Sequence, residues 1–346
     1  MKTIDLFAGV GGIRLGMEQA GFNTVFSNDF DSKCQMTFDL NFSDPSMTCE
    51  SIDDLDFDSI PDFDVLTGGF PCQPFSVAGK RGGFKDERGN HFFTIARLID
   101  LRRPTAFLLE NVKGLHTHDG GDTFRTILRT LYELGYFIRW KVLNSKVHAN
   151  IPQNRERLFI VGFKQEEHAS KFHFPEPEEL TTTYEEFLEA WEGAMDWLDT
   201  AEAETYFIKE GKVYDALQEF GVKEGYSYQW RYNYVREHKA KGCIPCLVTV
   251  GNSPIIKQDG LFRYLTPKEC FNLQGFPWWW EEEYKLPNIH NRHLYKQAGN
   301  SVTVPLIKKI GDELRYALLG LDPWDVEPPD YTEPYINSSG DLVYSY

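Results

Sequence analysis

A cysteine flanked by two prolines is the most reactive feature of the sequence. Residues 68–76 read Gly-Gly-Phe-Pro-Cys-Gln-Pro-Phe-Ser, and they put Cys72 just beyond an apolar run at 64–67. The proline rings fix φ at positions 71 and 74, one before and two after the cysteine, so the loop holds the cysteine rigidly. The thiolate is the attacking form of cysteine, which makes Cys72 a candidate nucleophile. A buried, inert cysteine is the structural alternative, but loops rich in glycine and proline run over surfaces.

A glutamate and two arginines could assist such a nucleophile. Glu110 ends the apolar run 106–110, where desolvation would raise the pKa of its carboxyl and favour a proton donor. Arg155 and Arg157 precede the apolar run 158–163, and strand alternation puts them on one side. Such a pair can clamp a carboxylate or a phosphate. Capping or surface charge is the structural alternative for all three residues.

A glycine turn near the N-terminus is a candidate nucleoside site. Residues 5–12 read Asp-Leu-Phe-Ala-Gly-Val-Gly-Gly, and the glycines permit a tight turn and a close ligand. Arg14 occupies the place of the third glycine of a dinucleotide fingerprint, so a nucleoside without a pyrophosphate is favoured. Asp29, at the end of the next strand, could accept hydrogen bonds from ribose hydroxyls, and Phe30 could stack on an adenine. A turn needed only for packing is the alternative.

The elements that must position these residues alternate between strands and helices. Apolar runs predict strands at 3–7, 24–28, 64–67, 106–110, 139–144 and 158–163, and helical patterns fall at 12–20, 31–41, 89–102 and 121–134. This alternation predicts an α/β fold with a largely parallel sheet, whose strands bind ligands at their carboxyl ends. Residues 176–204 are acidic and are predicted to be helical, residues 226–264 are aromatic, basic and β-prone, and residues 302–319 are again helical.

Composition and charge narrow the class of protein. The chain has 346 residues, no run of 18 apolar residues and six cysteines, which argues against a membrane span, a secretory signal and a disulfide framework. We therefore expect a cytoplasmic protein. The pair Cys243 and Cys246 stands alone, so we expect two small apolar side chains in a strand and no metal site. The net charge of −16 is concentrated in residues 29–64, 164–210 and 321–346, and the rest of the chain has an excess of bases.

Five segments taken together resemble the cytosine-5 DNA methyltransferases, particularly the bacterial restriction-modification and orphan enzymes. These segments are residues 5–12, 68–76, 110–112, 153–157 and 297–302, the last of which reads Gln-Ala-Gly-Asn-Ser-Val. The resemblance covers roughly residues 1–320. Residues 263–277 look like the family segment that joins the target-recognition region to the last helix.

The resemblance implies the S-adenosylmethionine-dependent methyltransferase (Rossmann-like) fold and a catalytic mechanism. Cys72 would attack C6 of a cytosine flipped out of double-stranded DNA, Glu110 would hold or protonate N3, Arg155 would contact the base, and Arg157 would order the site. No metal is implied. The residues that match family positions around S-adenosylmethionine, which becomes S-adenosylhomocysteine, are Phe7, Gly9, Gly11, Asp29, Phe30, Ser51, Ile52, Pro71, Asn300 and Ser301.

The recognition of DNA is expected from a basic, aromatic segment and from the loop after Cys72. Arginine reads guanine, and glutamine reads adenine or backbone; most such contacts nevertheless go to phosphates. The residues assigned to DNA are Gln229, Arg231, Arg236, Ser76, Lys80 and Arg81. The segment looks like the recognition regions of enzymes that act on CCGG or CC-x-GG sites. Cys246 stands where many family members carry threonine, so Thr249 is an alternative contact to the backbone of the target nucleotide.

The expected organisation is a catalytic and cofactor-binding domain at 1–185 plus 295–320, a small target-recognition domain at 186–294 and an acidic, proline-rich tail at 321–346. The protein is expected to act as a monomer in the cytoplasm of a bacterial or phage-infected cell, associated with the nucleoid. A tRNA cytosine-5 methyltransferase of the same fold and a catalytically dead DNA-binding paralogue are the two alternatives. The hundred residues of aromatic and basic sequence favour DNA, and the intact Cys72, Glu110 and arginine pair favour an enzyme.

Overall fold

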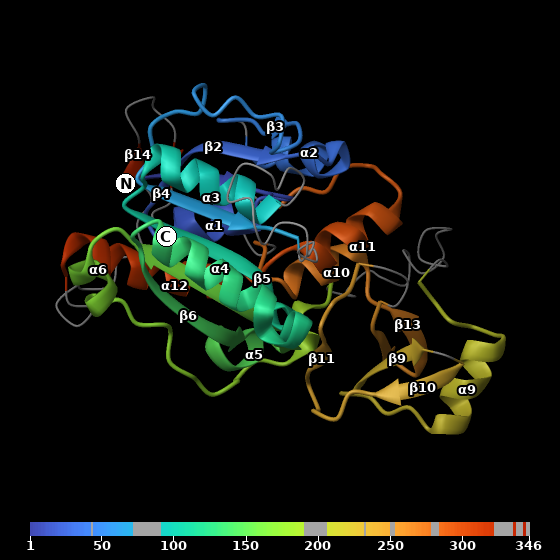
Figure 1. The fold of residues 1–346 in the computed structure, drawn as a ribbon. Coiled ribbons are helices and arrows are strands. Elements are labelled where there is room, and N and C mark those ends of the chain that lie inside the picture. Colours follow the sequence, from blue (N-terminus) through green and yellow to red (C-terminus); the bar gives the residue numbers. More distant parts are fainter. Residues whose placement is uncertain are drawn as a thin grey trace.

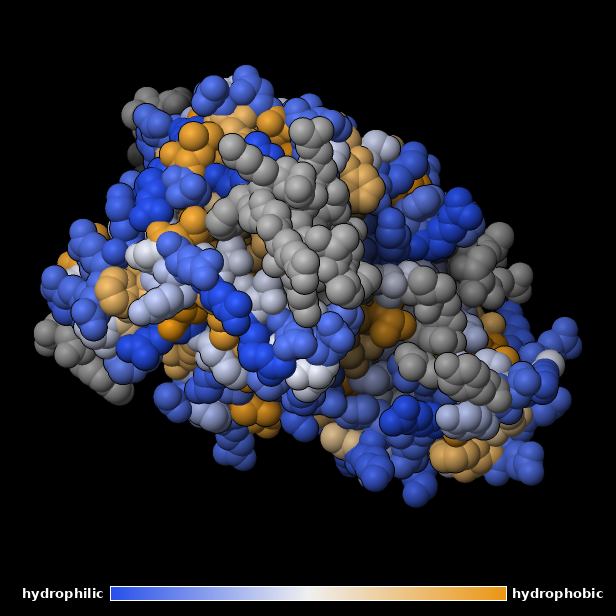
Figure 2. Space-filling view, in the orientation of Figure 1, coloured by the Kyte–Doolittle hydropathy of each residue, from blue (hydrophilic) through white to orange (hydrophobic). Residues whose placement is uncertain are grey.

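A computed structural model describes most of the chain. The described residues are 1–42, 44–71, 91–189, 206–231, 233–249, 253–277 and 284–321, together with the backbone of a short hairpin, β14 (Tyr335–Ile336) and β15 (Leu342–Val343). Within these ranges no helix is long and apolar enough to cross a membrane. The surface in Figure 2 is dominated by hydrophilic residues, with apolar residues in scattered patches.

A seven-stranded sheet forms the centre of the larger part of the molecule (Figure 1). Its order is β3-β2-β1-β4-β5-β8-β6, and all strands run parallel except β8, which is antiparallel to both of its neighbours. The strands are β1 (Lys2–Leu6), β2 (Asn23–Asp29), β3 (Thr48–Cys49), β4 (Val65–Gly69), β5 (Ala106–Val112), β6 (Phe137–Asn144) and β8 (Glu156–Phe163). The prediction of a largely parallel sheet is confirmed. The reversal of β8 brings its first residues to the rim where the parallel strands end.

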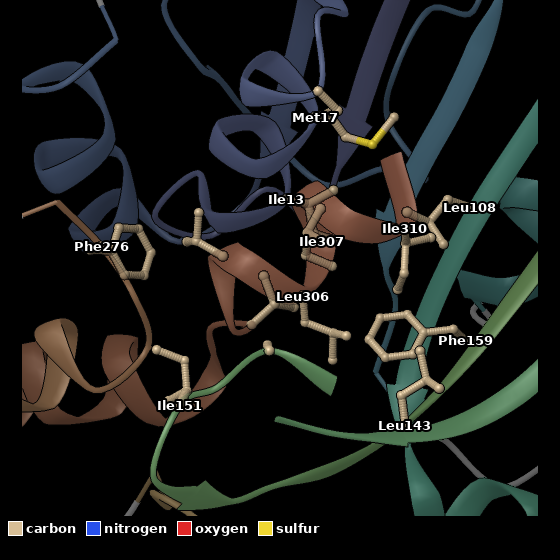
Figure 3. Packing of buried hydrophobic residues seen from close by; sticks show 14 of the residues in the cluster. Ile13, Met17, Leu108, Leu143, Ile151, Phe159, Phe276, Leu306, Ile307 and Ile310 are labelled. Atoms are coloured by element: carbon tan, nitrogen blue, oxygen red, sulfur yellow. The ribbon is translucent and has the colours of Figure 1, made fainter. Parts of the chain in front are cut away.

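Helices cover both faces of this sheet, because its buried strands point alternate side chains to opposite sides. In β5, Leu108 packs with α1 (Gly12–Gln19) and α12 (Val304–Leu319), whereas Phe107 and Leu109 pack with α3 (His91–Arg102) and α4 (Asp122–Glu133). Figure 3 shows Ile13 and Met17 of α1 meeting Ile307 and Ile310 of α12.

The two helices α1 and α12 approach closely because glycines stand at their contact. A β-carbon on Gly16 would lie 2.6 Å from the β-carbon of Ile307, and one on Gly311 would lie 2.7 Å from the β-carbon of Ala20. The remaining short elements around the sheet are α2 (Ser32–Asp39), η3 (Lys113–Gly121), α5 (Ser145–His148), α6 (Glu166–Lys171), α10 (Pro267–Asn272) and α11 (Asn291–Asn300).

A second sheet lies at one side of the first and is called here the recognition sheet (Figure 1). Its order is β10-β9-β12-β13, all antiparallel, and α9 (Lys212–Phe220) packs on it. The strands are β9 (Ser227–Arg231), β10 (Tyr234–Glu237), β12 (Ile255–Gln258) and β13 (Leu261–Tyr264). The β-prone segment 226–264 is therefore confirmed as strands, while the domain boundaries at 185 and 295 stay a prediction.

The recognition sheet is tied to the larger sheet at two buried points. β11 (Ile244–Pro245) pairs in parallel with β7 (Gln153–Asn154). Within β13, Arg263 donates to both carboxylate oxygens of Glu269 in α10, at 2.7 and 2.8 Å, and both side chains are 1% exposed. Charged groups this deeply buried are stable only when paired in this way.

The acidic segment differs from the prediction of a helix over 176–204. Its described part, 176–189, contains only the short 3-10 helix η4 (Tyr184–Phe187), and the rest lies outside the described residues. Pro177 disfavours helical backbone at Glu176 before it, and Thr183 begins η4 through a capping box with Glu186. The described acidic side chains therefore lie in irregular backbone, in η4 and just after it.

Candidate active site

The glycine turn between β1 and α1 is held by a carboxylate at the end of β2. The N–H of Gly9 donates to Oδ2 of Asp29 at 2.9 Å, and the N–H of Asp31 donates to Oδ1 at 2.9 Å. Phe7, Gly9 and Gly11 have φ values of 55°, 56° and 83°, a region that favours glycine. Burial raises the pKa of Asp29, and the backbone donors oppose the shift. The carboxyl ends of β1 and β2 are thus held together at the place where the sequence predicts a cofactor.

Close packing leaves no room for a β-carbon at Gly11 or Gly12 of this turn. A β-carbon on Gly11 would lie 2.2 Å from the ring of Phe42, and one on Gly12 would lie 2.7 Å from Oγ of Ser301. Arg14, at the place of the absent third glycine, is 4% exposed and donates to the carbonyls of Pro45 and Asp44 at 2.8 Å. Its guanidinium joins the turn-bearing helix to the loop after α2, which explains the departure from the dinucleotide fingerprint.

The other expected cofactor residues surround the turn at different depths. Phe30 is 69% exposed beside Asp29, whereas Ile52 is 3% exposed and packs in the core. Ser51 and Ser301 are half-buried, and Asn300 and Pro71 are exposed. An exposed aromatic ring next to a carboxylate suits a nucleoside, because one group can stack on a base while the other binds hydroxyls.

Glu110 and Arg157 form an ion pair at the rim of the sheet. Nε of Arg157 lies 3.1 Å from Oε1 of Glu110, and the two side chains are 15% and 10% exposed. Burial raises the pKa of Glu110, while the Arg157 and Arg155 guanidiniums oppose that shift. The reversed direction of β8 produces this meeting, because it pairs Arg157 with Val112 at the end of β5. The carboxyl is therefore biased towards its protonated form beside a fixed positive charge.

Arg155 is buried at 1% exposure and connects three segments. It donates to the carbonyl of Leu247 at 3.3 Å, to the carbonyl of Gly299 at 3.1 Å and to the carbonyl of Ser301. Burial lowers the pKa of Arg155 to about 10, which still leaves it charged near neutral pH. Through these hydrogen bonds, the guanidinium holds the backbone at 247 and the backbone at 299–301 together.

Two residues that sequence reasoning did not assign complete this cluster. Sγ of Cys246 lies 3.3 Å from Nη1 of Arg155 and 3.9 Å from both terminal nitrogens of Arg157. The expectation of two cysteines in a strand is wrong, because Cys243 and Cys246 lie just before and just after the two-residue β11; Cys243 is buried as expected, and Cys246 is half-buried. Residue 299 must be glycine, because a β-carbon there would lie 2.5 Å from the backbone of Val248. The Gly-Asn-Ser sequence at 299–301 is the signal that could have identified this residue.

Cys72 and residues 73–90, which include Ser76, Lys80 and Arg81, lie outside the described residues. The strand that leads to them is described: β4 ends at Gly69, which pairs with Glu110 on β5. Nδ2 of Asn111 donates to the carbonyl of Phe70 at 2.8 Å and fixes the backbone two residues before Cys72. The chain thus enters the Cys72 segment beside Glu110.

The expected DNA-reading residues lie on β9 and β10. Arg236 is exposed and stands opposite Gln229, which is only 7% exposed. The expected contacts of Gln229 and Arg236 with DNA stay predictions. The backbone of Arg231 pairs with Tyr234, and its side chain lies outside the described part of the chain.

Comparison with known proteins identifies the family of the chain. Residues 1–315 match the C-5 cytosine-specific DNA methylase family. The chain belongs to this family. It is 43% identical to the Type II methyltransferase M.Bsp6I of a Bacillus species over 92% of this chain and 100% of that one. It is 40% identical to M.NgoBI of Neisseria gonorrhoeae over 89% and 90% of the two chains.

The fold of this DNA methylase is also found among solved structures. The methyltransferase EhMeth of Entamoeba histolytica matches with a TM-score of 0.67 and 16% identity, over 92% of this chain and 98% of that one. Fold and family together confirm the resemblance drawn from the sequence. The protein is a DNA cytosine-5 methyltransferase, and its family supports the use of S-adenosylmethionine.

The raised pKa of Glu110 gives a stability prediction. The folded methylase holds the carboxyl proton more tightly than the unfolded chain, so this group stabilises most below its unfolded pKa, and that contribution is lost as pH rises through the folded pKa. Glu110→Gln carries no such proton. We expect the variant to melt above the wild type near pH 8, with a gap that narrows towards about pH 4.

Calorimetric melting across this pH range makes the measurement. Glu133→Gln, at an exposed position of α4, is the matched control and should follow the wild type at every pH. A Glu110→Gln variant that melts below the wild type at alkaline pH would show that the Arg157 pairing outweighs burial.

Proposed function

We propose that the methylase modifies a cytosine flipped out of double-stranded DNA, through a covalent bond between Cys72 and C6 of the base. The observation that carries this proposal is the buried Glu110–Arg157 pair, located where β4 delivers the chain to Cys72. A cytosine inside a duplex cannot reach a rim that is this enclosed, so the base must leave the stack. The protein works as a monomer in this proposal, with domain boundaries near 185 and 295.

The chemistry proceeds by addition and elimination. The Cys72 thiolate adds to C6, and the protonated Glu110 carboxyl donates to N3, so that C5 becomes nucleophilic without a full negative charge on the ring. S-adenosylmethionine, when bound, supplies the methyl group to C5 and leaves as S-adenosylhomocysteine. Loss of the C5 proton to a base then expels Cys72 as a thiolate, and N3 returns its proton to Glu110, which restores the aromatic ring and the protonated carboxyl.

The residues around the glycine turn fit a nucleoside cofactor. Asp29 already has each carboxylate oxygen engaged by one backbone N–H, which orients its remaining lone pairs, and Phe30 offers an exposed ring beside it. We propose that these two residues hold the ribose and the adenine, with Phe7, Gly9 and Gly11 shaping the pocket. Asn300 and Ser301 approach from the end of α11, since Ser301 lies against Gly12.

The two arginines exchange the roles expected from the sequence. Arg157 retains a partly accessible side chain and pairs with Glu110, so we propose that it contacts the target base. Arg155 is fully buried and donates to three carbonyls, so we propose that it positions the site without touching substrate.

Cys72→Ser should abolish methylation of duplex DNA while S-adenosylmethionine still binds, because the cofactor groups are separate from the nucleophile. The wild type should also form a stable adduct with a duplex containing 5-fluorocytosine, since fluorine cannot leave as the C5 proton does. Methyl transfer from labelled cofactor and denaturing gels measure the two effects, with Cys243→Ser as a control and tRNA as a competing substrate. Normal turnover by Cys72→Ser would remove this residue from its role, and methylation of tRNA alone would favour the alternative enzyme.

Arg155→Lys and Arg157→Lys should separate the two arginine roles. Lysine cannot reach several carbonyls at once, so we expect Arg155→Lys to lower the free energy of unfolding by roughly 2–4 kcal/mol. Arg157→Lys keeps the charge near Glu110 and loses a directed donor, so kcat should fall about 10²-fold. Urea unfolding and steady-state kinetics measure these effects. A stable Arg155→Lys variant combined with an unfolded Arg157→Lys variant would reverse the assignment.

Arg231 and Arg236 provide a test of sequence recognition. A base-reading arginine is worth about 1–3 kcal/mol at one base pair, whereas a phosphate contact weakens all sequences alike. We expect Arg231→Ala or Arg236→Ala to relax the preference at one position of the site. Methylation of a randomised DNA library, read by bisulfite sequencing, reports both site and rate. If both variants keep the parental preference at every position, this segment only clamps the DNA backbone.

A further inference from the structure

Cys246 contacts both guanidiniums of the active site, although it takes no part in the proposed addition and elimination. Its side chain is half-buried, and its Sγ accepts a hydrogen bond from Nη1 of Arg155 at 3.3 Å. The same sulfur lies 3.9 Å from both terminal nitrogens of Arg157. One thiol therefore touches the buried arginine of the junction and the arginine of the rim at once.

The backbone fixes the position of this thiol. β11 pairs in parallel with β7, so the residues that follow the two strands, Cys246 and Arg155, lie side by side. The next N–H along the chain, that of Leu247, donates to the side-chain oxygen of buried Gln153 at 3.1 Å. The position of the thiol is therefore set by backbone contacts rather than by Arg157.

The guanidinium of Arg157 is restrained at each of its three nitrogens. Its Nε lies 3.1 Å from Oε1 of Glu110, and its Nη1 donates to the carbonyl of Glu156 at 2.8 Å. The sulfur of Cys246 contacts Nη1 and Nη2, the terminal nitrogens at the other end of the group from Nε. Because a guanidinium is planar and rigid, a restraint at its terminal nitrogens also fixes the direction of Nε.

The two guanidiniums repel each other, and the sulfur offsets part of that repulsion. Burial, followed by the charge of Arg157, lowers the pKa of Arg155, whereas the Cys246 thiol raises it. Sulfur is a weak acceptor, but hydrogen bonds are stronger in buried surroundings than in water. Removal of the sulfur would leave the repulsion in place and take away one of the contacts that hold Arg157.

We propose that Cys246 is a positioning residue for methyl transfer, whose sulfur holds the guanidinium of Arg157 against Glu110. The inference rests on the proposed roles of Glu110 and Arg157, and it adds a residue that acts through them without touching the reacting atoms. Such support matters because a displacement of about 1 Å in an active site can cost about 10²-fold in rate.

Cys246→Val and Cys246→Thr form a matched pair, because valine and threonine have the same shape and only threonine carries an acceptor. We expect Cys246→Val to lower kcat on duplex DNA roughly tenfold, since Glu110 and the Glu156 carbonyl still restrain Arg157. The affinity for S-adenosylmethionine should not change, and Cys246→Thr should keep kcat close to the wild-type value. Steady-state methyl transfer from labelled cofactor measures these effects. Cys243→Ala, at the other end of β11, is the control for loss of a thiol and should keep the wild-type kcat.

The proton on Glu110 reports the position of Arg157 without any reaction. Burial raises the pKa of Glu110, and the charges of Arg157 and then Arg155 lower it. A displaced Arg157 would let this pKa rise further, so that ionised Glu110 destabilises the folded protein more strongly at about pH 8. Glu110→Gln should therefore raise the melting temperature at that pH by more in the Cys246→Val background than in the wild-type background. The two effects should converge towards about pH 4, where the carboxyl is largely protonated in both states.

Calorimetric melting of the four proteins measures this coupling, which a residue needed only for packing would leave unchanged. Cys246→Ala also lacks an acceptor and replaces Cys246→Val if the valine variant does not fold. A larger Glu110→Gln effect in this background, together with a lower kcat that Cys246→Thr restores, supports the positioning role.

Two results would overturn the inference while the proposed function stands. One is a Glu110→Gln effect that is the same in both backgrounds, and the other is an unchanged kcat in spite of the coupling. Methylation of duplex DNA by the wild type tests the function alone. A wild type that does not methylate duplex DNA overturns the proposed function and, with it, the positioning role of Cys246 in methyl transfer.

Discussion

The buried guanidinium of Arg155 is the constraint on which the site depends. Removing a cation from water costs several kcal/mol, which hydrogen bonds from its donors offset. Both terminal nitrogens of Arg155 donate, while its Nε has no partner among the described residues. Arg155 meets its acceptors on segments 92, 144 and 146 residues away along the chain, at Leu247, Gly299 and Ser301. The segment that follows β11, the end of α11 and the loop before β8 must therefore meet at one point. Nearby Gln153 strengthens this junction, because it accepts from the N–H of Leu247 and donates to the carbonyl of Leu273.

The direction of β8 then brings the charged residues of the active site together. If β8 ran parallel to its neighbours, its first residues would lie at the opposite edge of the sheet from the end of β5. Because β8 is antiparallel, Arg157 lies beside Val112 and can pair with Glu110. Arg155 and Arg157 are two positions apart in the chain and have different roles. Arg155 reaches into the packed junction, and Arg157 reaches the rim.

Much of this arrangement could be predicted from the sequence, for physical reasons. Alternating apolar runs and helical patterns located the six strands and four helices, and Glu110 was placed at the rim because it ends an apolar run. The direction of β8 could not be predicted, since a buried strand has the same pattern in either orientation. The role of Arg155 depends on carbonyls that are remote in the chain and invisible to local patterns. The acidic segment was predicted wrongly for another reason: its glutamates favour helices, whereas its described residues 176–183 have irregular backbone, to which Pro177 contributes at Glu176.

The two buried anchors of the recognition sheet have a consequence for how such a protein diversifies. One anchor is the pairing of β11 with β7, and the other is the Arg263–Glu269 pair that fixes β13 to α10. Exposed strand positions such as Arg236 take part in neither anchor. Surface substitutions there can accumulate without disturbing the geometry of Glu110 and Arg157. If this sheet reads DNA as proposed, the recognised sequence can therefore change while the chemistry is inherited unchanged.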